Sequence, residues 1–129
     1  MDKMDQALRE MDFDFFGSGE HSISVPEAAR VYEENKAFFL DVRTREEVGL
    51  LNFPRAKNIP VSELPDRLDE IPAQGLVIVM CSSIFRAALV YGYLLSKGFD
   101  SLKGLTGSIE QLAAQLKPGP LYQRSGRGK

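Results

Sequence analysis

The alternation of two kinds of segment along this chain predicts an α/β fold. Short apolar runs rich in β-branched and aromatic residues alternate with segments whose apolar residues recur at helical spacing. One run, LVIVM at residues 76–80, is apolar at every position, which is typical of a strand buried on both faces of a parallel sheet. Ligands of such sheets bind at the carboxyl ends of the strands, so the residue after this run, Cys81, lies where a site is expected.

Four strands are expected in the middle of the chain. They are residues 37–42 (AFFLDV), 56–59, 76–80 and, with a weaker pattern, 101–103. Helix start signals precede three other segments. Ser24 with Glu27 and Thr44 with Glu47 each fit a capping box, in which two side chains satisfy free backbone N–H groups of the first turn. A third helix is expected from Ser62, in the sequence SELPDRLDEI.

Two further helices are expected after the central strand. Residues 85–97 carry apolar side chains at helical spacing, and Gly98 follows as the expected C-terminal cap. Ser108 opens the last expected helix, SIEQLAAQL.

The composition is that of one ordinary globular domain. The chain has 129 residues, of which 43% are hydrophobic and 26% charged, and this excludes a disordered chain, a collagen-like repeat and a disulfide scaffold. The formal net charge of −2 argues against a nucleic-acid partner. One cysteine and one histidine exclude an intrachain disulfide and a zinc site built from these residue types, and we expect no metal or organic cofactor.

No targeting or membrane-spanning segment is expected. The longest apolar runs, such as residues 76–81, are far shorter than the roughly 20 residues of a transmembrane helix. The first residues show no basic start followed by an apolar run, so we expect no secretory signal. A reduced, cytoplasmic location is therefore predicted, with the thiol free and no membrane partner.

Charge divides the chain into three zones. Residues 1–22 form an acidic flank, residues 23–116 the folded domain, and residues 117–129 a basic tail, rich in Gly and Pro, that we expect to be flexible. The flank has apolar residues near helical spacing, so it either packs onto the domain or forms a partner-binding helix. His21, which lies outside every motif, is interpreted as a solvated or packing residue.

The segment CSSIFR, residues 81–86, forms a short loop between the central strand and the following helix. Backbone N–H groups of such a loop and of the helix N-terminus bind anions and favour a thiolate over a thiol. Arg86 adds a fixed positive charge five residues after Cys81, which we predict to be a nucleophile. The cradle for its charged sulfur is expected from the backbone N–H groups of Ser82, Ser83, Ile84, Phe85 and Arg86.

Asp41 and Arg43 lie at the end of another expected strand. A catalytic role is one interpretation. The preferred one is a structural pair that braces the strand end near the site, because a buried charge needs a partner.

Five motifs occur in the order found in a known family. They are LDVR at 40–43 followed by Glu46 and Glu47, FPRAKNIP at 53–60, the loop from Cys81 to Arg86, Gly98 with Phe99, and LTGSI at 105–109. Over about residues 23–116 the chain resembles the single-domain rhodanese-like sulfurtransferases. The resemblance implies a five-stranded, mainly parallel sheet with helices on both faces. It also implies that Cys81 accepts a sulfane sulfur atom as a persulfide and passes it to an acceptor.

The loop departs from the family pattern in ways that bear on the donor. Ile84 stands where the family often has glycine, and residues 82–85 carry no charge. Thiosulfate is a small hydrated dianion that needs positive charge to offset lost water, whereas apolar loop surface suits a larger partner. We predict a thiol persulfide or protein persulfide as the donor, a thiol or protein as the acceptor, and weak activity with thiosulfate.

Two other functions stay open. A non-catalytic protein-interaction module with this fold would also present Ile84 and Phe85 to a partner. A phosphatase or arsenate reductase is the weaker alternative, because cysteine phosphatases place five residues between Cys and Arg, and Ala87 stands at that position here.

Overall fold

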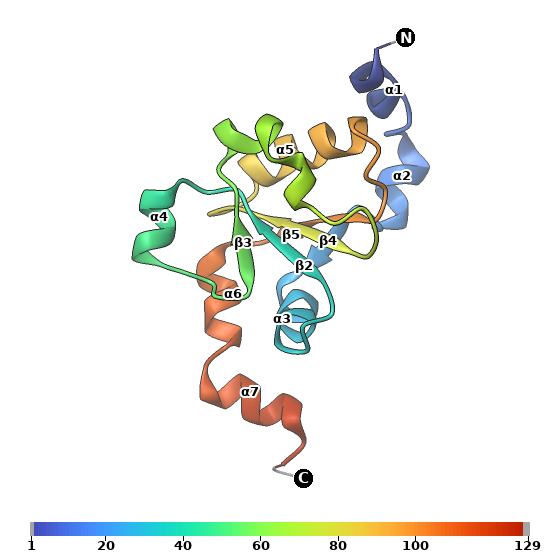
Figure 1. The fold of residues 1–129 in the computed structure, drawn as a ribbon. Coiled ribbons are helices and arrows are strands. Elements are labelled where there is room, and N and C mark those ends of the chain that lie inside the picture. The colour runs from blue at the N-terminus through green and yellow to red at the C-terminus, as the bar shows by residue number, and fades with distance from the viewer. Residues whose placement is uncertain (1, 128–129) are drawn as a thin grey trace.

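The computed structural model describes residues 2–127 and shows a parallel sheet with helices on both of its faces (Figure 1). Five strands pair in the order β1-β5-β4-β2-β3, and every pairing is parallel. The strands are β1 (Ser22–Ser24), β2 (Phe38–Asp41), β3 (Ala56–Asn58), β4 (Val77–Met80) and β5 (Leu102–Thr106). The predicted α/β class and five-stranded sheet are confirmed.

The strands are connected by α-helices and by two 3₁₀ helices. The α-helices are α1 (Lys3–Arg9), α2 (Phe13–Ser18), α3 (Val25–Glu33), α4 (Arg45–Leu50), α5 (Phe85–Ser96), α6 (Ile109–Gln115) and α7 (Pro118–Ser125). The 3₁₀ helices are η1 (Val61–Asp66) and η2 (Leu68–Glu70). Helix α5 covers one face of the sheet, and α3 and α6 cover the other (Figure 1).

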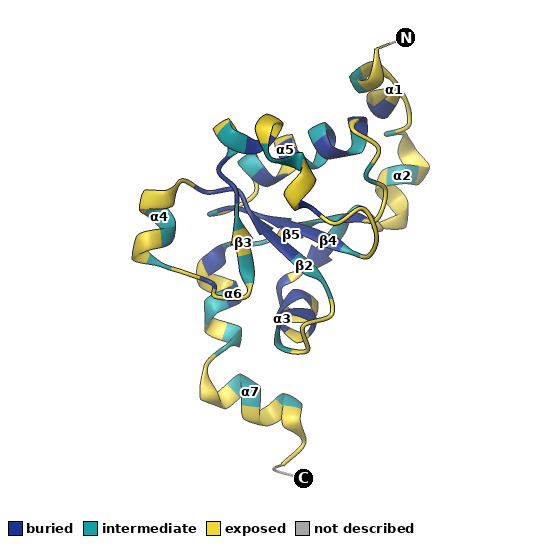
Figure 2. Ribbon diagram, viewed as in Figure 1, coloured by how far each residue is buried: buried dark blue, intermediate teal, exposed yellow. Residues whose placement is uncertain are grey.

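Strand β4 lies at the centre of the sheet and contributes to the core on both sides. It pairs with β2 along one edge and with β5 along the other. Val77 and Val79 belong to the apolar cluster beneath α5, whereas Ile78 and Met80 belong to the cluster against α3 and α6. The continuous apolar run therefore identified a strand that is buried on both faces, as Figure 2 shows by its colour.

The predicted helix starts are found at Ser24, Thr44 and Ser108, but of the two predicted capping boxes only the one at Thr44 forms completely, because the Glu27 carboxylate pairs with Arg30 instead. Thr44 and Glu47 make both halves of a capping box at α4, and Ser108 and Gln111 make one at α6. At α3 the side chain of Ser24 accepts a hydrogen bond from a first-turn backbone N–H group. Each cap satisfies an amide that the helix itself leaves unpaired.

Two glycines allow the turns that end α5 and begin α6. Gly98 follows α5 with a φ of +95°, a conformation that glycine adopts without steric cost. Gly107 has a φ of +153°, and a Cβ atom there would lie 2.5 Å from Cγ2 of Val25. The second turn therefore brings the start of α6 close to α3, which a side chain at residue 107 would prevent.

Some local predictions are wrong. The helix expected from Ser62 is replaced by η1 and η2, because Pro65 has no backbone N–H group to continue α-helical hydrogen bonding. The last strand extends to Thr106, beyond the expected residue 103. Strand β1 gave no usable pattern, since it has three residues and pairs along one edge only, with β5.

The N-terminal flank packs onto the domain. Helix α1 lies against α5, with Ala7 buried, and Cε of Met4 lies 3.3 Å from the position that a Cβ of Gly92 would occupy. Of the two interpretations of this flank, packing onto the domain is therefore the one that the structure shows for α1.

The C-terminal stretch, expected to be a flexible tail, contains helix α7. Its Pro118 stands in the first turn, where the missing N–H group costs nothing. Arg124 donates to a carboxylate oxygen of Glu33 at 3.0 Å and to the backbone oxygen of Gln115 at 2.8 Å, which ties α7 to α3 and α6. Within residues 2–127, no helix combines the length and the apolar character needed to cross a bilayer.

Candidate active site

Cys81 is the first residue after β4, and its side chain is almost completely buried. Only 1% of the residue is exposed. Its Sγ accepts a hydrogen bond from the backbone N–H group of Ala87, with 3.3 Å between nitrogen and sulfur. That amide lies in the first turn of α5, where N–H groups have no partner within the helix. The sulfur thus faces the positive end of the helix dipole.

The amide that contacts the sulfur is one residue beyond the predicted cradle. The sequence predicts the N–H groups of residues 82–86, but the bond to Sγ comes from Ala87. The turn of the chain through residues 82–85 brings the third residue of α5 back over the sulfur. This return is a three-dimensional property that the spacing of the motif did not show.

Ser82 joins the loop to two neighbouring elements. Its backbone oxygen accepts a hydrogen bond from the N–H group of Ile109 at the start of α6, at 3.2 Å. Its hydroxyl oxygen accepts one from the guanidinium group of Arg86, at 2.9 Å. Ser82 at the start of the loop is therefore held both by α6 and by Arg86 at the end of the loop.

Arg86 forms a two-pronged ion pair with Glu47 of α4. The distances are 2.7 Å from Nη1 to Oε1 and 2.9 Å from Nη2 to Oε2. The hydrogen bonds from Arg86 and from the Thr44 backbone lower the pKa of Glu47 to about 2. The sequence predicts Glu47 to be a helix-capping residue and part of the acidic turn. It does not predict the contact with the cysteine loop, because 39 positions separate Glu47 from Arg86.

Asp41 and Arg43 form a second ion pair at the end of β2, and this one is buried. Their side chains are 2% and 1% exposed, and Nη2 of Arg43 lies 2.7 Å from Oδ2 of Asp41. Arg43 also donates to the backbone oxygen of Leu51. The side-chain amide of Asn58 donates to the backbone oxygens of both residues, at 2.9 Å each. The pair and its partners brace the ends of β2 and β3 beside the loop.

Ile84 and Phe85 face outward rather than into the core. Their exposed fractions are 52% and 80%, and Ser83 is exposed as well. Ile84 has a φ of −139°, so the loop does not require the glycine that the family often has at this position. The outer surface of the loop therefore carries two large apolar side chains beside the polar Ser83.

The fold and the site together define a class: a parallel α/β domain with one buried cysteine between a central strand and a helix N-terminus. Residues 24–115 match the family model of the rhodanese-like domain. This match covers most of the chain, which therefore belongs to the rhodanese-like domain family.

Several similar proteins carry sulfurtransferase names. The chain is 29% identical over 80 residues to a protein called sulfurtransferase from Allochromatium vinosum, a match that covers 62% of this chain and 75% of that one. It is 41% identical over 56 residues to the human thiosulfate:glutathione sulfurtransferase, covering 43% of this chain and 49% of that protein. The chain thus spans about half the length of the human relative.

Solved structures show the same fold. A rhodanese-like domain protein from Staphylococcus aureus superposes with a TM-score of 0.65 at 30% identity, covering 70% of this chain and 89% of that one. The sequence resemblance to the rhodanese-like family is thereby confirmed.

Proposed function

We propose that this protein transfers sulfane sulfur through a persulfide on Cys81. The observation that carries the proposal is the bond from the Ala87 N–H group to Sγ of Cys81, because that amide lies where it stabilises negative charge on sulfur. The sulfurtransferase names of the relatives support the same chemistry. The Cys81 thiolate attacks the outer sulfur of a donor, a bond forms between the two sulfurs, and the donor's own bond to that sulfur breaks. The electron pair of the broken bond leaves with the donor.

The proposed donor is a thiol persulfide or a protein persulfide rather than thiosulfate. The one cation of the loop, Arg86, is already paired with Glu47, so little net positive charge is offered to a small dianion. Burial of the thiol restricts access to a slender terminal atom such as a sulfane sulfur, which persulfides and thiosulfate both carry, so charge rather than access separates the two donors. A thiol or a protein would then accept the sulfur from the loaded cysteine.

Intact-protein mass spectrometry tests the proposal. The protein is exposed to glutathione persulfide and, separately, to thiosulfate, and each sample is then treated with cyanide. We expect gain of one sulfur atom, more readily from glutathione persulfide, and its removal by cyanide. A Cys81→Ser variant that is folded by circular dichroism is expected to gain none, since the chain has no other thiol. A parent protein that gains no sulfur from either donor, or a serine variant that still gains it, contradicts the proposal.

A second candidate function is a protein-interaction module without turnover. The observation in its favour is the apolar surface next to the loop, where Phe85 is 80% and Leu89 57% exposed. The same mass spectra separate the two functions, because a module that lacks turnover takes up no sulfur at Cys81.

A further inference from the structure

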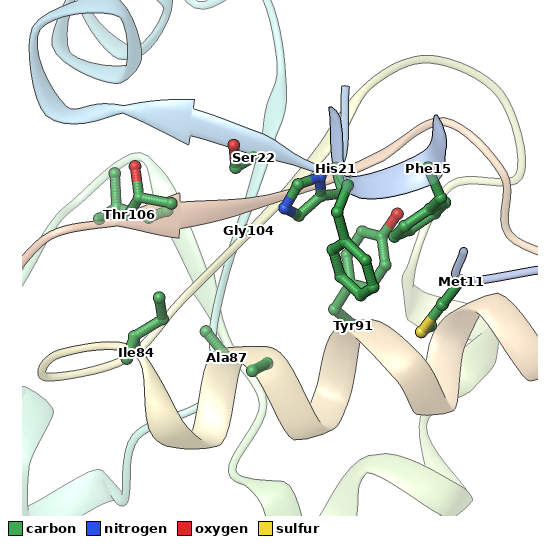
Figure 3. A pocket seen from close by; sticks show the side chains of 12 residues that line it. Met11, Phe15, His21, Ser22, Ile84, Ala87, Tyr91, Gly104 and Thr106 are labelled. Carbon is green, nitrogen blue, oxygen red and sulfur yellow. The ribbon is translucent and has the colours of Figure 1, made fainter. Parts of the chain in front are cut away.

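A cavity of about 220 Å³ lies beside the cysteine loop, between α5, the strands β1 and β5, and the N-terminal flank. Figure 3 shows the side chains that surround it. Its walls include Phe15, Phe16, His21, Ile84, Ala87 and Tyr91. Ser22 and Thr106 add hydroxyl groups to the lining, but most of the cavity surface is hydrocarbon, so the cavity is suited to a mainly apolar molecule.

One side of this cavity is made by a segment outside the family domain. Phe15 and Phe16 belong to α2 and His21 precedes β1, whereas the family match begins at residue 24. The acidic flank therefore does more than cover α5: it completes a cavity that residues 24–115 do not enclose by themselves.

The cavity adjoins the reactive sulfur through a single residue. Ala87 lines the cavity, and its own backbone N–H group donates to Sγ of Cys81 at 3.3 Å. Ile84, three residues after the cysteine, lines the same cavity from the loop (Figure 3). A molecule held here contacts Ala87, whose backbone amide contacts the sulfur, whereas Cys81 itself does not line the cavity.

His21 supplies a polar atom to this apolar surface. Its ring stacks on Phe15 with 5.3 Å between centroids and meets Phe16 edge to face at 5.4 Å. Its Nδ1 is buried and has no hydrogen-bond partner among the described residues. The imidazole ring lines the cavity, so a turn of the ring presents a nitrogen to a ligand that brings a hydrogen-bonding group.

We propose that this cavity binds the organic body of a small, apolar thiol that exchanges sulfur with Cys81. An apolar cavity of about 150 Å³ holds benzene, so the present one fits a single ring with a short chain. The inference rests on the proposed function for its sulfur step. In that step R–S–SH and Cys81–SH give R–SH and Cys81–S–SH: one S–S bond forms, one breaks, the proton moves to the leaving thiolate, and the reverse step loads the thiol.

The first experiment measures binding without sulfur chemistry. The probe is 4-ethylphenol, added to the full chain and followed by NMR chemical shifts. We expect shifts at His21, Ala87 and Tyr91. Ala88→Leu, at the rim of the cavity, is expected to weaken binding about tenfold by filling space, and His21→Phe about threefold to tenfold by removing a hydrogen bond. Leu89→Ala, on the same helix but outside this cavity, is the matched control and is expected to leave binding unchanged.

The second experiment connects binding to transfer. The protein is loaded with glutathione persulfide, and sulfur release is compared for 4-(2-sulfanylethyl)phenol and for 2-mercaptoethanol. Ala88→Leu is expected to lower kcat/KM for the phenol thiol about tenfold and to leave that for 2-mercaptoethanol unchanged. Absence of binding in the parent, or equal effects on both thiols, overturns the inference even if loading is normal. Binding without any loading overturns the proposed function and the identification of the ligand as a thiol, while the cavity remains a binding site.

Discussion

Two arginine–carboxylate pairs lie at the carboxyl end of the sheet, and they differ in burial. In the pair of Arg43 with Asp41, the side chains are 1% and 2% exposed. In the pair of Arg86 with Glu47, they are 28% and 36% exposed. The first pair joins residues two positions apart in the chain, whereas the second joins the cysteine loop to α4.

The difference separates a structural pair from one that can exchange partners. Asp41 and Arg43 are surrounded by protein groups, and neither is exposed to solvent that could replace a lost partner. Glu47 and Arg86 reach solvent, so either can be hydrated when the contact opens. An arginine beside a reactive cysteine is useful to an incoming anion only if its carboxylate partner can be released, and the half-exposed pair meets that condition.

The same substitution at both arginines gives the largest expected effect. Arg43→Met leaves the Asp41 carboxylate buried with a backbone N–H donor but without a cationic partner, and we expect it to lower the free energy of unfolding by about 3–5 kcal/mol. Arg86→Met leaves a carboxylate that water can reach, so the expected loss is about 1 kcal/mol or less. Urea denaturation of the two variants and the parent measures both. Equal losses at the two positions would show that burial does not distinguish the pairs.

The second prediction concerns sulfur loading. Arg86→Met is expected to fold and to load sulfur from glutathione persulfide about tenfold more slowly. A charge-assisted hydrogen bond from Arg86 to a bound anion contributes about 1.5–3 kcal/mol to its binding free energy. Because Glu47 competes for Arg86, we expect a contribution near the lower end of this range, which corresponds to about tenfold. The rate of mass gain measures the effect. Normal loading in a folded variant would assign Arg86 a purely structural role.

The third prediction concerns pH and the carboxylate of the exposed pair. The pKa of Glu47 is about 2 in the folded protein and ordinarily about 4.3 in an unfolded chain. A lowered folded pKa means that this stabilisation is complete above about pH 5 and disappears as the pH falls toward 2. Glu47→Gln removes it, so we expect the variant to be about 1 kcal/mol less stable at pH 7 and equal to the parent near pH 2. Urea denaturation from pH 7 to pH 2 measures the difference, and a constant difference would contradict the ion pair.

Local sequence patterns predicted the strand and the helices that position this site. Contacts between residues far apart in the sequence determine which groups meet around Cys81. The buried run ending at residue 80, the capping box at Thr44, the helix start at Ser108 and the cap at Gly98 each depend on neighbouring residues, so sequence spacing was sufficient. The predicted helix from Ser62 failed because one proline outweighed the start signal.

Contacts between residues far apart in the sequence could not be predicted from the spacing of residues within a motif. The bond from Ala87 to the sulfur depends on how the loop turns, and the contact between Arg86 and Glu47 depends on packing of α4 against the loop. The helix at the C-terminus is held partly by Arg124, whose partner Glu33 lies on α3. Composition alone suggested a flexible tail because such partners are not visible in a single sequence.

The smallest expected effect concerns the choice of sulfur donor. It depends on the Arg86–Glu47 pair and on the charge of the cysteine loop. If pairing with Glu47 leaves the loop short of positive charge, then a second cation on its outer surface is expected to improve the use of thiosulfate. Ile84 is 52% exposed, so lysine there can keep its ammonium group in water. We expect Ile84→Lys to raise kcat/KM for thiosulfate a few-fold relative to that for glutathione persulfide, because an exposed charge contributes only about 0.2–1 kcal/mol. The gain is expected to shrink in high salt, which screens exposed charges. Ile84→Met, which keeps an apolar side chain, is the control, and an unchanged ratio in the lysine variant would show that residue 84 does not face the incoming donor.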